Sequence, residues 1–599
     1  MSDYETHTFD VLVIGAGGAG LRAAVETEAA GATTAVVCKS LLGKAHTVMA
    51  EGGIAAALGS VWPEDSWQVH FRDTMRGGKM LNNWRMAQLH AQESPDRVLE
   101  LESWGALFDR TPDGRILQRD FGGHRYARLA HVGDHTGLEM IRTLQDRAVA
   151  AGIEVFMECK IIRLLTDPSG AVCGALGLWR ESGQFVVFHA KAVILASGGI
   201  GKTWKFTTNS WEGTGDGHAL ALWAGAELVD MECIQFHPTG MIWPASARGL
   251  LVTEAVRGDG GILKNRDGER FMFSYIPEYY ADETADTIEE ADKWYDDKTF
   301  RRPPELLPRD EVARAVNAEV KAGRGSPHGG VYLDIASRRS PEYIRRRLPS
   351  MYQQFKELAD VDITTQMMEI GPTCHYAMGG VRVEADTEAS TVPGLFAAGE
   401  VAGGMHGANR LGGNSLSDLL VFGRRAGIGA VEYARGLQHP PVPDPGEVEA
   451  AAAAALGFFD HGGPENPYAV HQDLQEAMQS LVGIIRTEAD LVRAVELLDE
   501  LDGRARAVAV EGPRQFNPAW HLALDLQSML AVARATTLAA IARRESRGGH
   551  TRDDYPDPDP EHFGKLNMVV RLDKGTVTVT ERPIPPMPDE LAALLAAER

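Results

Sequence analysis

The hydrophobic pattern of the chain is clearest in residues 9–20, FDVLVIGAGGAG. Residues 11–14 form a continuous apolar run rich in β-branched residues, which is typical of a strand buried on both faces of a parallel sheet. Gly15, Gly17 and Gly20 follow in G-x-G-x-x-G spacing, and the next residues, LRAAVETEAA, have helical periodicity. In such a unit the glycines allow a tight turn, a close approach to a pyrophosphate and close packing of helix on strand, while the helix N-terminus attracts phosphate. The pattern favours a dinucleotide site over a glycine turn without a ligand.

Strand and helix patterns alternate along most of the remaining chain. Short apolar runs predict further buried strands at 33–40, 191–199, 332–337 and 392–400. Apolar residues at helical spacing predict helices within 80–110 and 135–152, after GTGDG at 213–217, from residue 310 and through 448–545. The FHPTG sequence at 236–240 interrupts the strand pattern, whereas KGTVTVTER near the C-terminus alternates as a strand does. This order indicates an α/β protein followed by a helical region.

The charge of the chain limits its partners. Its 599 residues carry a formal net charge of −23, which argues against binding to nucleic acid or an anionic membrane, because phosphates would be repelled. An anionic substrate would bind only where local arginines overcome this field. No run of about 18 or more apolar residues occurs, so we expect no transmembrane helix.

The five cysteines are scattered, and no two have the C-x-x-C spacing of a zinc or iron–sulfur site. An odd number of separate cysteines suits a reducing cytoplasm. The acidic N-terminal segment lacks the features of a signal peptide. We therefore expect a cytoplasmic protein without a metal centre of its own, whose association with a membrane would depend on other chains.

Two features of the N-terminal region bear on the type of dinucleotide. A generic NAD fold places an Asp or Glu near the end of the second strand to bind a ribose hydroxyl, but Lys39 and Ser40 stand here, which argues against NAD. His46 then lies in a loop rich in Gly and Ala, and Gly52 and Gly53 follow, which allow close backbone approach to a flat or charged group. A single histidine is most often simply hydrogen-bonded or exposed, so His46 alone indicates no role.

An acidic segment, 278–297, precedes a basic helix. It contains nine Asp and Glu residues and a single Lys. This composition favours a solvated surface excursion, and a surface that faces a partner is the alternative.

Ten sequence motifs, which together cover nearly the whole chain, carry a family resemblance. They are IGAGGAG, AHTVMAEGG, RILQRDFGGH, FHPTG, LLVTEAVRGDGG, LPRDEVARA, PTCHYAMGG, GLFAAGE, GANRLGGNSLSDLLVFGR and NPAWHLALDL…ESRGGHTR. With these motifs the chain resembles the flavoprotein subunit of succinate dehydrogenase and fumarate reductase. The resemblance implies an α/β fold in which a Rossmann-like FAD-binding domain, 1–235 and 371–440, is interrupted by an inserted α+β capping domain, 236–370. A helical domain, 441–545, and a small C-terminal region, 546–599, would follow.

The resemblance implies that the cofactor is FAD and not NAD. His46 matches the histidine that bonds covalently to the flavin in this family, and such a tether raises the oxidising power that removal of hydride from a saturated C–C bond requires. Lys44, Ala45, Met49 and Glu51 depart from the residues usual around this histidine. The other positions that match FAD contacts are Gly15, Gly17, Gly18, Gly20, Lys39, Ser40, Thr47, Gly52, Gly53, Asp216, Glu400, Asn414, Ser415 and Leu416.

The resemblance also implies a four-carbon dicarboxylate substrate that is held at both ends. Arg410 and His375 match the family's clamp on one carboxylate, where a guanidinium fork fits two oxygens. His237, with Thr253 and Glu254, matches the other end, and Phe121 matches an aromatic residue that borders the substrate. Taken singly, an arginine is usually a surface charge and a threonine before a helix would also suit a cap.

Arg309 matches the family's proton-transfer arginine, and Glu254 and Arg257 match its relay partners. Free arginine has a pKa above about 12, so it can act as a base only if its proton leaves as another arrives. The implied step transfers a hydride from one methylene of succinate to flavin N5 while Arg309 takes a proton from the other methylene; fumarate reduction is the reverse. Holding donor, acceptor and base together supplies much of the rate.

Two departures from the family pattern concern the site. The acidic segment 278–297 lengthens the approach to Arg309, so we expect an enlarged, mobile capping domain. Cys374 stands beside His375 where a small apolar residue is more common. Its thiol is either inert packing or a redox-sensitive group.

The resemblance implies partners as well, because a chain without a cysteine cluster needs another carrier for electrons that leave FAD. These partners are an iron–sulfur subunit together with membrane anchor subunits that handle quinone, which would place this chain on the inner face of the cell membrane. The rival interpretations are a fumarate reductase working in the reverse direction, L-aspartate oxidase with non-covalent FAD, and a non-catalytic flavoprotein scaffold. His46, the ESRGGHTR region and Arg309 favour the dehydrogenase.

Overall fold

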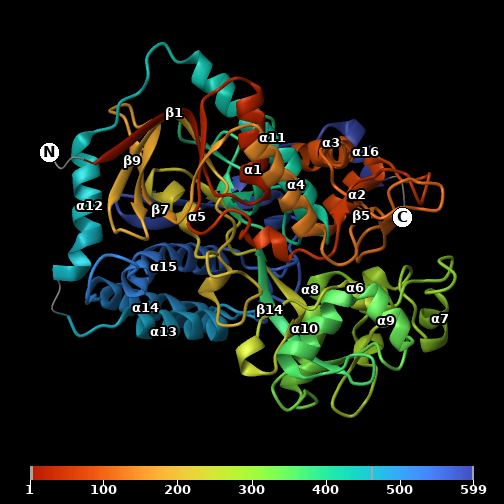
Figure 1. The fold of residues 1–599 in the computed structure, drawn as a ribbon. Helices are drawn as coiled ribbons and strands as arrows, with labels where there is room; N and C mark the ends of the chain where they lie inside the picture. The colour runs from red at the N-terminus through yellow and green to blue at the C-terminus, as the bar shows by residue number, and fades with distance from the viewer. Residues whose placement is uncertain (1–3, 461–462, 597–599) are drawn as a thin grey trace.

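A computed structural model describes residues 4–460 and 463–596 (Figure 1). Its larger part is built on seven strands, which are β1 (Glu5–Ile14), β2 (Thr34–Val37), β6 (Glu154–Phe156), β7 (Cys159–Thr166), β8 (Val172–Trp179), β9 (Phe185–Leu195) and β16 (Leu395–Ala397). They form one sheet in the order β6-β2-β1-β9-β8-β7, with β16 paired to the end of β9. β1, β2, β6, β9 and β16 are parallel, and β7 and β8 extend the sheet in antiparallel fashion.

The apolar runs predicted as buried strands form the centre of this sheet. Val11, Leu12 and Val13 of β1 are fully buried between β2 and β9. The helices of this part are α1 (Gly18–Ala29), α2 (Trp67–Gly77), α3 (Trp84–Ser103), α4 (Thr136–Ala150), α5 (Asp216–Trp223) and α11 (Asn414–Gly436). α1 and α11 lie side by side (Figure 1), and a Cβ atom on Gly423 would come within 2.6 Å of the carbonyl oxygen of Ala19. A small sheet beside them contains β3 (Ile54–Ala55), β4 (Gln118–Arg119) and β5 (Leu129–Ala130).

A four-stranded antiparallel sheet forms the second part, at the lower right of Figure 1. Its strands, in order, are β11 (Ile234–Met241), β14 (Met368–Ala377), β13 (Val331–Asp334) and β12 (Ile262–Lys264). Its helices are α6 (Ala255–Gly258), α7 (Ile288–Lys293), α8 (Arg309–Lys321), α9 (Pro341–Arg347) and α10 (Pro349–Ala359). This part has a hydrophobic core of its own, around Val256, Leu263, Val316 and Phe355. The expected α/β fold with an inserted α+β region is therefore confirmed.

The FHPTG sequence lies inside β11, so its interpretation as a break in the strand pattern was wrong. The ladder between β11 and β14 is irregular between His237 and Gly240. Pro238 falls in this irregular stretch, where its missing N–H group costs no regular ladder hydrogen bond. A strand with a proline at an irregular position in its ladder is therefore hard to predict from the sequence pattern.

The predicted helical region contains α12 (Pro445–Asp460), α13 (Pro467–Leu481), α14 (Glu488–Arg506) and α15 (Pro518–Ala542). After it, the predicted C-terminal strand is confirmed as β19 (Thr576–Pro583), which forms a hairpin with β18 (Leu566–Asp573). The hairpin completes a sheet with β10 (Leu228–Val229), β15 (Gly380–Arg382) and β17 (Ala402–Gly403) of the larger part. The C-terminal residues are therefore an integral layer of the fold.

Buried ion pairs and a terminal helix hold this layer in place. Arg543 is fully buried and ion-paired with Asp230 and Glu232 at 3.2 and 2.6 Å. α16 (Asp589–Ala596) packs on α2, with Leu591 beside Phe71. Within 4–460 and 463–596, no helix combines the length and the apolar character needed to cross a membrane.

Candidate active site

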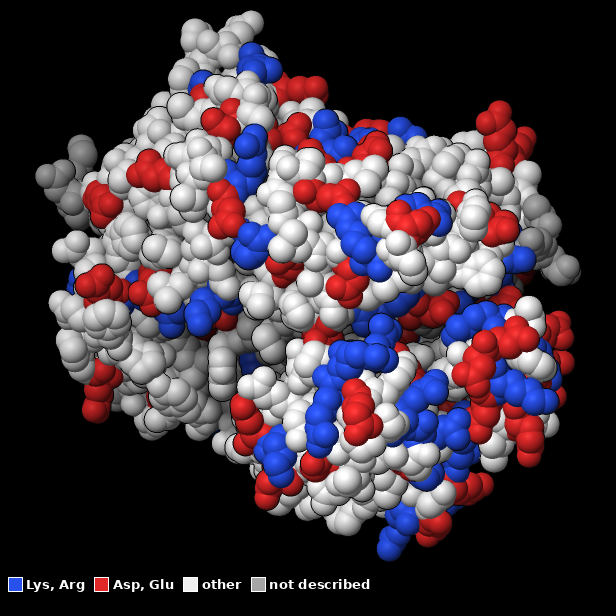
Figure 2. All heavy atoms as spheres, turned by 45° about the vertical axis from the view of Figure 1, so that its right-hand side comes forward, with Lys and Arg blue, Asp and Glu red and all other residues white. Residues whose placement is uncertain are grey.

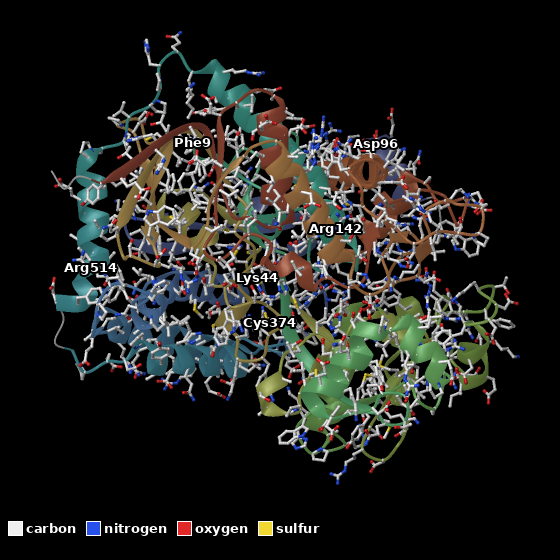
Figure 3. The ribbon with its side chains drawn as sticks, in the orientation of Figure 1. Phe9, Lys44, Asp96, Arg142, Cys374 and Arg514 are labelled. Atoms are coloured by element: carbon white, nitrogen blue, oxygen red, sulfur yellow. The ribbon has the colours of Figure 1, made fainter. Side chains whose placement is uncertain are left out.

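One cavity extends from the β1–α1 turn to the second part of the molecule, built on β11–β14 and named the capping part below. Its empty space, open mouth included, is about 1750 Å³. Lys44 on its wall and Cys374 in β14 mark its place near the centre of Figure 3. The predicted site residues that line it are Gly15, Gly17, Gly18, Lys39, Ser40, His46, Thr47, Gly52, Gly53, Phe121, Asp216, His237, Thr253, Glu254, Arg309, His375, Glu400, Arg410, Ser415 and Leu416. Gly20, Arg257 and Asn414 were predicted too but do not line it.

The glycines of the β1–α1 turn pack closely against the protein backbone on one side and line the cavity on the other. Gly15 has a φ of +118°, and a Cβ atom there would lie 2.2 Å from the carbonyl oxygen of Ala196. A Cβ atom on Gly20 would lie 1.9 Å from the carbonyl oxygen of Gly15, so this glycine lets α1 pack on the turn. Gly17 is the N-cap of α1 and contributes no capping side chain. Gly17, Gly18 and Ala19 at this helix end line the cavity, where a helix N-terminus suits a phosphate group.

Gly52 and Gly53 line the cavity and also pack closely against other residues of the protein. A Cβ atom on Gly52 would lie 2.8 Å from the ring of Phe121, and one on Gly53 (φ +134°) would lie 2.9 Å from the carbonyl oxygen of Ala130. Close packing therefore requires glycine at both positions, beyond the ligand approach that the sequence predicted. Thr47 Oγ1 accepts a hydrogen bond of 3.3 Å from the first backbone N–H of α1.

Lys39 and Asp216, both partly buried, form an ion pair on the wall of the cavity. Lys39 Nζ lies 3.0 Å from Asp216 Oδ2 and 2.5 Å from Asp525 Oδ1 of α15, and Lys160 pairs with both carboxylates. Burial would raise the pKa of Asp216, but Lys160 and Lys39 hold it well below its ordinary value. Nothing in the local sequence pattern indicated Asp525, which lies 486 positions from Lys39.

His46 presents a neutral imidazole to the cavity. It begins a short 3-10 turn, His46–Met49, and its Nδ1 is buried without a hydrogen-bond partner in the described part of the chain. Burial lowers the pKa of His46 to about 4, and the positive charges of Lys202 and Arg410 contribute. An unprotonated ring nitrogen is the form that can bond to an electrophilic carbon.

Asn414 and Glu400 support the cavity wall from different sides. The Asn414 amide bonds to His70 (2.9 Å) and Thr74 (3.0 Å) of α2, which explains why it does not face the cavity as predicted. Glu400 accepts a hydrogen bond of 3.0 Å from the N–H of Ala377. Burial raises the pKa of Glu400 to about 7, against this hydrogen bond and the charge of Arg410.

Arg309 and Arg410, predicted from separate motifs, share one acceptor. Gln235 Oε1 accepts a hydrogen bond of 3.2 Å from Arg309 NH1 and one of 3.1 Å from Arg410 NH2. Gln235 is 1% exposed. Sequence reasoning missed this residue, although the alternation of a strand places it on the same face of β11 as His237, two positions further on.

Glu254 lies between Arg309 and Arg257. Its Oε2 accepts a hydrogen bond of 3.0 Å from Arg309 Nε and lies 3.7 Å from Arg257 NH2, and its Oε1 accepts one of 2.8 Å from the N–H of Gly122. Burial would raise the pKa of Glu254, but Arg257 and Arg309 hold it below its ordinary value. Arg257 is fully buried and donates to the carbonyl oxygen of Glu305, and burial lowers its pKa. The three predicted residues thus form one continuous series of contacts.

Two neutral histidines complete this end of the cavity. The rings of His237 and His375 have centroids 5.0 Å apart. The ladder pairs Cys374 and Tyr376 with consecutive residues of β11, which leaves His375 as the extra residue of a β-bulge. Burial holds the pKa of both histidines well below the ordinary value, and the charge of Arg309 lowers both further.

Comparison with known proteins gives the family. Residues 10–416 match the family described as FAD binding domain, and residues 471–590 match the family described as fumarate reductase flavoprotein C-term. The chain belongs to the succinate dehydrogenase/fumarate reductase flavoproteins. It is therefore an FAD-dependent oxidoreductase.

Three similar proteins span almost the full length of this flavoprotein. The solved structure of Mycobacterium smegmatis Sdh1 in complex with UQ1 is 58% identical with a TM-score of 0.86, covering 98% of this chain and 96% of that one. A fumarate reductase (CoM/CoB) subunit of Methanothermobacter marburgensis is 44% identical over 93% of this chain and 96% of its own length. The succinate dehydrogenase flavoprotein subunit of Coxiella burnetii is 37% identical over 95% and 96%.

The flavoprotein carries a buried carboxyl group that sequence reasoning did not place in the site. Glu51 lines the cavity, hydrogen-bonds to Thr253, and has an Oε2 atom without a partner in the described residues. Burial raises the pKa of Glu51 well above its ordinary value, and the charge of Asp134 adds to the effect, against that of Arg119. The one sequence feature that could have indicated a role for Glu51 is its difference from the residue usual at this position in the family.

The acidic segment of the flavoprotein, 278–297, is exposed in part and tied to the larger part in part. Tyr280 accepts a hydrogen bond of 3.3 Å from Lys79 Nζ, at the end of α2. Arg302, just after the segment, donates to the carbonyl oxygen of Phe121 at 3.5 Å. Figure 2 shows the capping part in the lower half of the view, with acidic and basic side chains intermixed on its surface. The segment therefore contacts the larger part at Lys79, and Arg302 adds a second contact just beyond the segment.

Cys374 is 1% exposed and does not line the cavity. Burial raises the pKa of its thiol well above the ordinary value, and the charge of Glu400 contributes. A buried, neutral thiol is unreactive. Of the two interpretations of Cys374, the structure favours inert packing.

Proposed function

We propose that this flavoprotein oxidises succinate to fumarate as the catalytic subunit of a succinate dehydrogenase. The observation that carries the proposal is the pairing of Arg309 and Arg410 on Gln235 Oε1, beside His237 and His375, at the end of an FAD-binding cavity. Two buried cations and two neutral imidazoles suit a small dianion and suit no cation or neutral substrate.

The residues around the cavity fit FAD. The N-terminus of α1 at Gly17, which lines the cavity, suits the pyrophosphate. Ser197 and His46 also line the cavity, and Ser197 Oγ and His46 Nδ1 are buried polar atoms that lack a partner in the described chain. When bound, FAD supplies the two-electron acceptor for the substrate hydride. We propose that His46 holds it covalently, because its neutral ring nitrogen is free to form the bond.

The substrate carboxylates are proposed to bind at opposite ends of the capping face. Arg410 and His375 would hold one carboxylate, and His237 and Thr253 the other, with Phe121 along the side. Burial and the neighbouring Arg309 lower the pKa of Arg410 to about 9, which still leaves it charged at neutral pH. Removal of both carboxylates from water is therefore offset by charge-assisted hydrogen bonds.

Arg309 is proposed to take the proton from the substrate methylene. Its Nε remains bonded to Glu254 at 3.0 Å, and Glu254 in turn lies 3.7 Å from Arg257. A proton delivered to Arg309 can thus leave toward Glu254 while the guanidinium stays charged on average. The capping part, which we place at 236–370, would bring Arg309 to the substrate and exclude water.

We infer that electrons leave through an iron–sulfur subunit, then through membrane anchor subunits that handle quinone, which would hold this chain on the inner face of the cell membrane. Support comes from the 58% identical Mycobacterium smegmatis Sdh1, which was solved in complex with UQ1. The 44% identical archaeal relative is named a fumarate reductase, so fumarate reduction is the second candidate direction.

Purification with co-isolated subunits, followed by succinate- and fumarate-dependent dye assays, tests this proposal. We expect succinate oxidation, an iron–sulfur partner in the complex, and flavin fluorescence that stays with the chain on a denaturing gel. Arg309→Lys should abolish turnover and leave FAD bound, because a lysine cannot reach Glu254 and Gln235 together. Loss of flavin on the gel together with L-aspartate oxidation would instead identify L-aspartate oxidase.

A further inference from the structure

We propose that Thr208 is a positioning residue that fixes the tautomer and the orientation of His375 for carboxylate binding. The proposal rests on the proposed function, because it assumes that His375 contacts a substrate carboxylate. Thr208 does not line the cavity, so it would act only through His375.

The strand ladder alone does not orient His375. This residue is the bulged position of β14, so β11 offers it no regular partner. A neighbouring loop supplies hydrogen bonds instead. The backbone N–H of Cys374 donates to the carbonyl oxygen of Phe206 at 2.8 Å, and the carbonyl oxygen of Cys374 accepts from the N–H of Thr208 at 3.0 Å. Asn209 Nδ2 donates to the carbonyl oxygen of His375 at 2.9 Å. The loop thereby holds the backbone on both sides of the imidazole.

The Thr208 hydroxyl then reaches the ring itself. Its Oγ1 lies 2.7 Å from His375 Nδ1, which is the only hydrogen bond of this hydroxyl among the described residues. With Nδ1 engaged by the loop, the other nitrogen, Nε2, is the one left for the cavity. His237 and Arg410 line the same cavity.

The charge of the ring decides which nitrogen carries the proton. Burial, His237, Arg309 and Arg410 hold the pKa of His375 well below its ordinary value, so the imidazole is neutral and has one N–H group. A proton on Nδ1 would direct the Nε2 lone pair at the substrate carboxylate, which is repulsive. A proton on Nε2 donates to the carboxylate and requires Nδ1 to accept from Thr208. The hydrogen bond made by one ring nitrogen sets the protonation of the other in this way.

The loop does not depend on the hydroxyl for its own structure. Besides the backbone bonds to Cys374, Thr207 Oγ1 donates to the Cys374 carbonyl oxygen at 2.9 Å and Asn209 accepts from the N–H of Gly201 at 3.1 Å. Thr208→Val, which matches threonine in shape, therefore removes the contact to the ring and leaves the rest of the loop in place.

Malonate, a dicarboxylate that does not react, is the probe, and its dissociation constant is titrated on the FAD-loaded complex through the flavin absorption spectrum. We expect Thr208→Val to raise this constant about tenfold, since one buried hydrogen bond to a ligand-binding group is lost. Thr208→Ser, which keeps the hydroxyl, should stay within about twofold of the wild type. Thr203→Val is the matched control, because Thr203 is fully buried nearby and its hydroxyl has no partner in the described chain.

Combination with His375→Ala separates a positioning role from a structural one. If Thr208 acts through the ring, Thr208→Val adds nothing to His375→Ala, whereas independent effects would multiply. An unchanged constant for Thr208→Val, or an equal loss in the His375→Ala background, overturns the proposal. If Thr208→Val does not retain FAD, Thr208→Ala and Thr208→Ser are compared in the same cycle. Malonate binding that survives both His375→Ala and Arg410→Ala would refute the proposed function itself.

Discussion

Replacement of Gln235 by leucine removes the one carbonyl oxygen that Arg309 and Arg410 share. The side chain is 1% exposed, and its Oε1 accepts hydrogen bonds of 3.2 and 3.1 Å from the two guanidinium groups. Its Nε2 donates to Asn409 Oδ1 at 2.9 Å and to the carbonyl oxygen of Arg410 at 2.7 Å. Leucine has a similar volume, so the change removes hydrogen bonds and little packing.

The size of the effect follows from these contacts. A hydrogen bond to a charged group contributes about 1.5–3 kcal/mol, so the two bonds to guanidinium groups correspond to about 3–6 kcal/mol. Arg309 keeps Glu254 at 3.0 Å and Arg410 keeps Ser415 at 2.7 Å, so both cations stay but lose the acceptor between them. If roughly half of this energy, about 1.5–3 kcal/mol, is lost in the transition state, kcat/KM falls about 10- to 100-fold.

Succinate-dependent dye reduction, expressed per bound FAD, measures this fall. Gln118→Leu is the control, because Gln118 is also buried and in the described structure bonds only to the backbone of Ser60, Ala56 and Arg128. We expect Gln118→Leu to lower stability and to leave kcat/KM per FAD nearly unchanged. A Gln235→Leu enzyme within about threefold of the wild type, or an equal loss in Gln118→Leu, would show that the shared acceptor has no specific role in turnover.

The flavin tether, a buried carboxyl group and a cation between the two parts of the molecule are each open to a direct test. His46→Ala should release FAD on a denaturing gel and lower succinate oxidation at least about tenfold more than fumarate reduction, because an untethered flavin is a weaker oxidant; an unchanged ratio of the two activities would contradict this. Because burial raises the pKa of Glu51 above its ordinary value of 4.5, its contribution to stability is complete below pH 4.5 and is lost as the pH rises through the folded-state pKa. Glu51→Gln should therefore flatten the decline of Tm above pH 4.5, and parallel Tm curves for the two proteins would count against it. Lys79→Met removes a cation that lies 3.9 and 3.6 Å from Asp310 and Glu311, and it costs about 1 kcal/mol because Arg314 still pairs with both carboxylates. Hydrogen exchange should accelerate in α7 and α8 but not in β1, and a uniform change would argue for global destabilisation instead.

The parts of the fold that the sequence predicts well are those with a local physical signal. The run Val11–Ile14 is apolar without interruption because its strand is covered on both faces, and it became the centre of the sheet. FHPTG misled because Pro238 breaks the pattern, while the irregular ladder around it accommodates the missing N–H group. Strand prediction from pattern fails where a bulge replaces regular pairing.

The residues that were missed act through contacts between distant positions. Gln235 bridges Arg309 and Arg410, which follow it by 74 and 175 positions. Asp525 contacts Lys39 only because α15 packs against α5. Local sequence periodicity cannot predict contacts between residues so far apart in the chain. Motifs therefore place the individual charged residues, and the tertiary structure alone supplies the acceptors that hold them together.

The most direct test of the proposed site is an experimental structure of the purified complex with malonate bound. We expect flavin density that begins at the α1 N-terminus, is continuous with His46, and ends against a dicarboxylate held by Arg410, His375 and Arg309. Flavin density absent from this cavity, or malonate bound away from these three side chains, would contradict the proposed function.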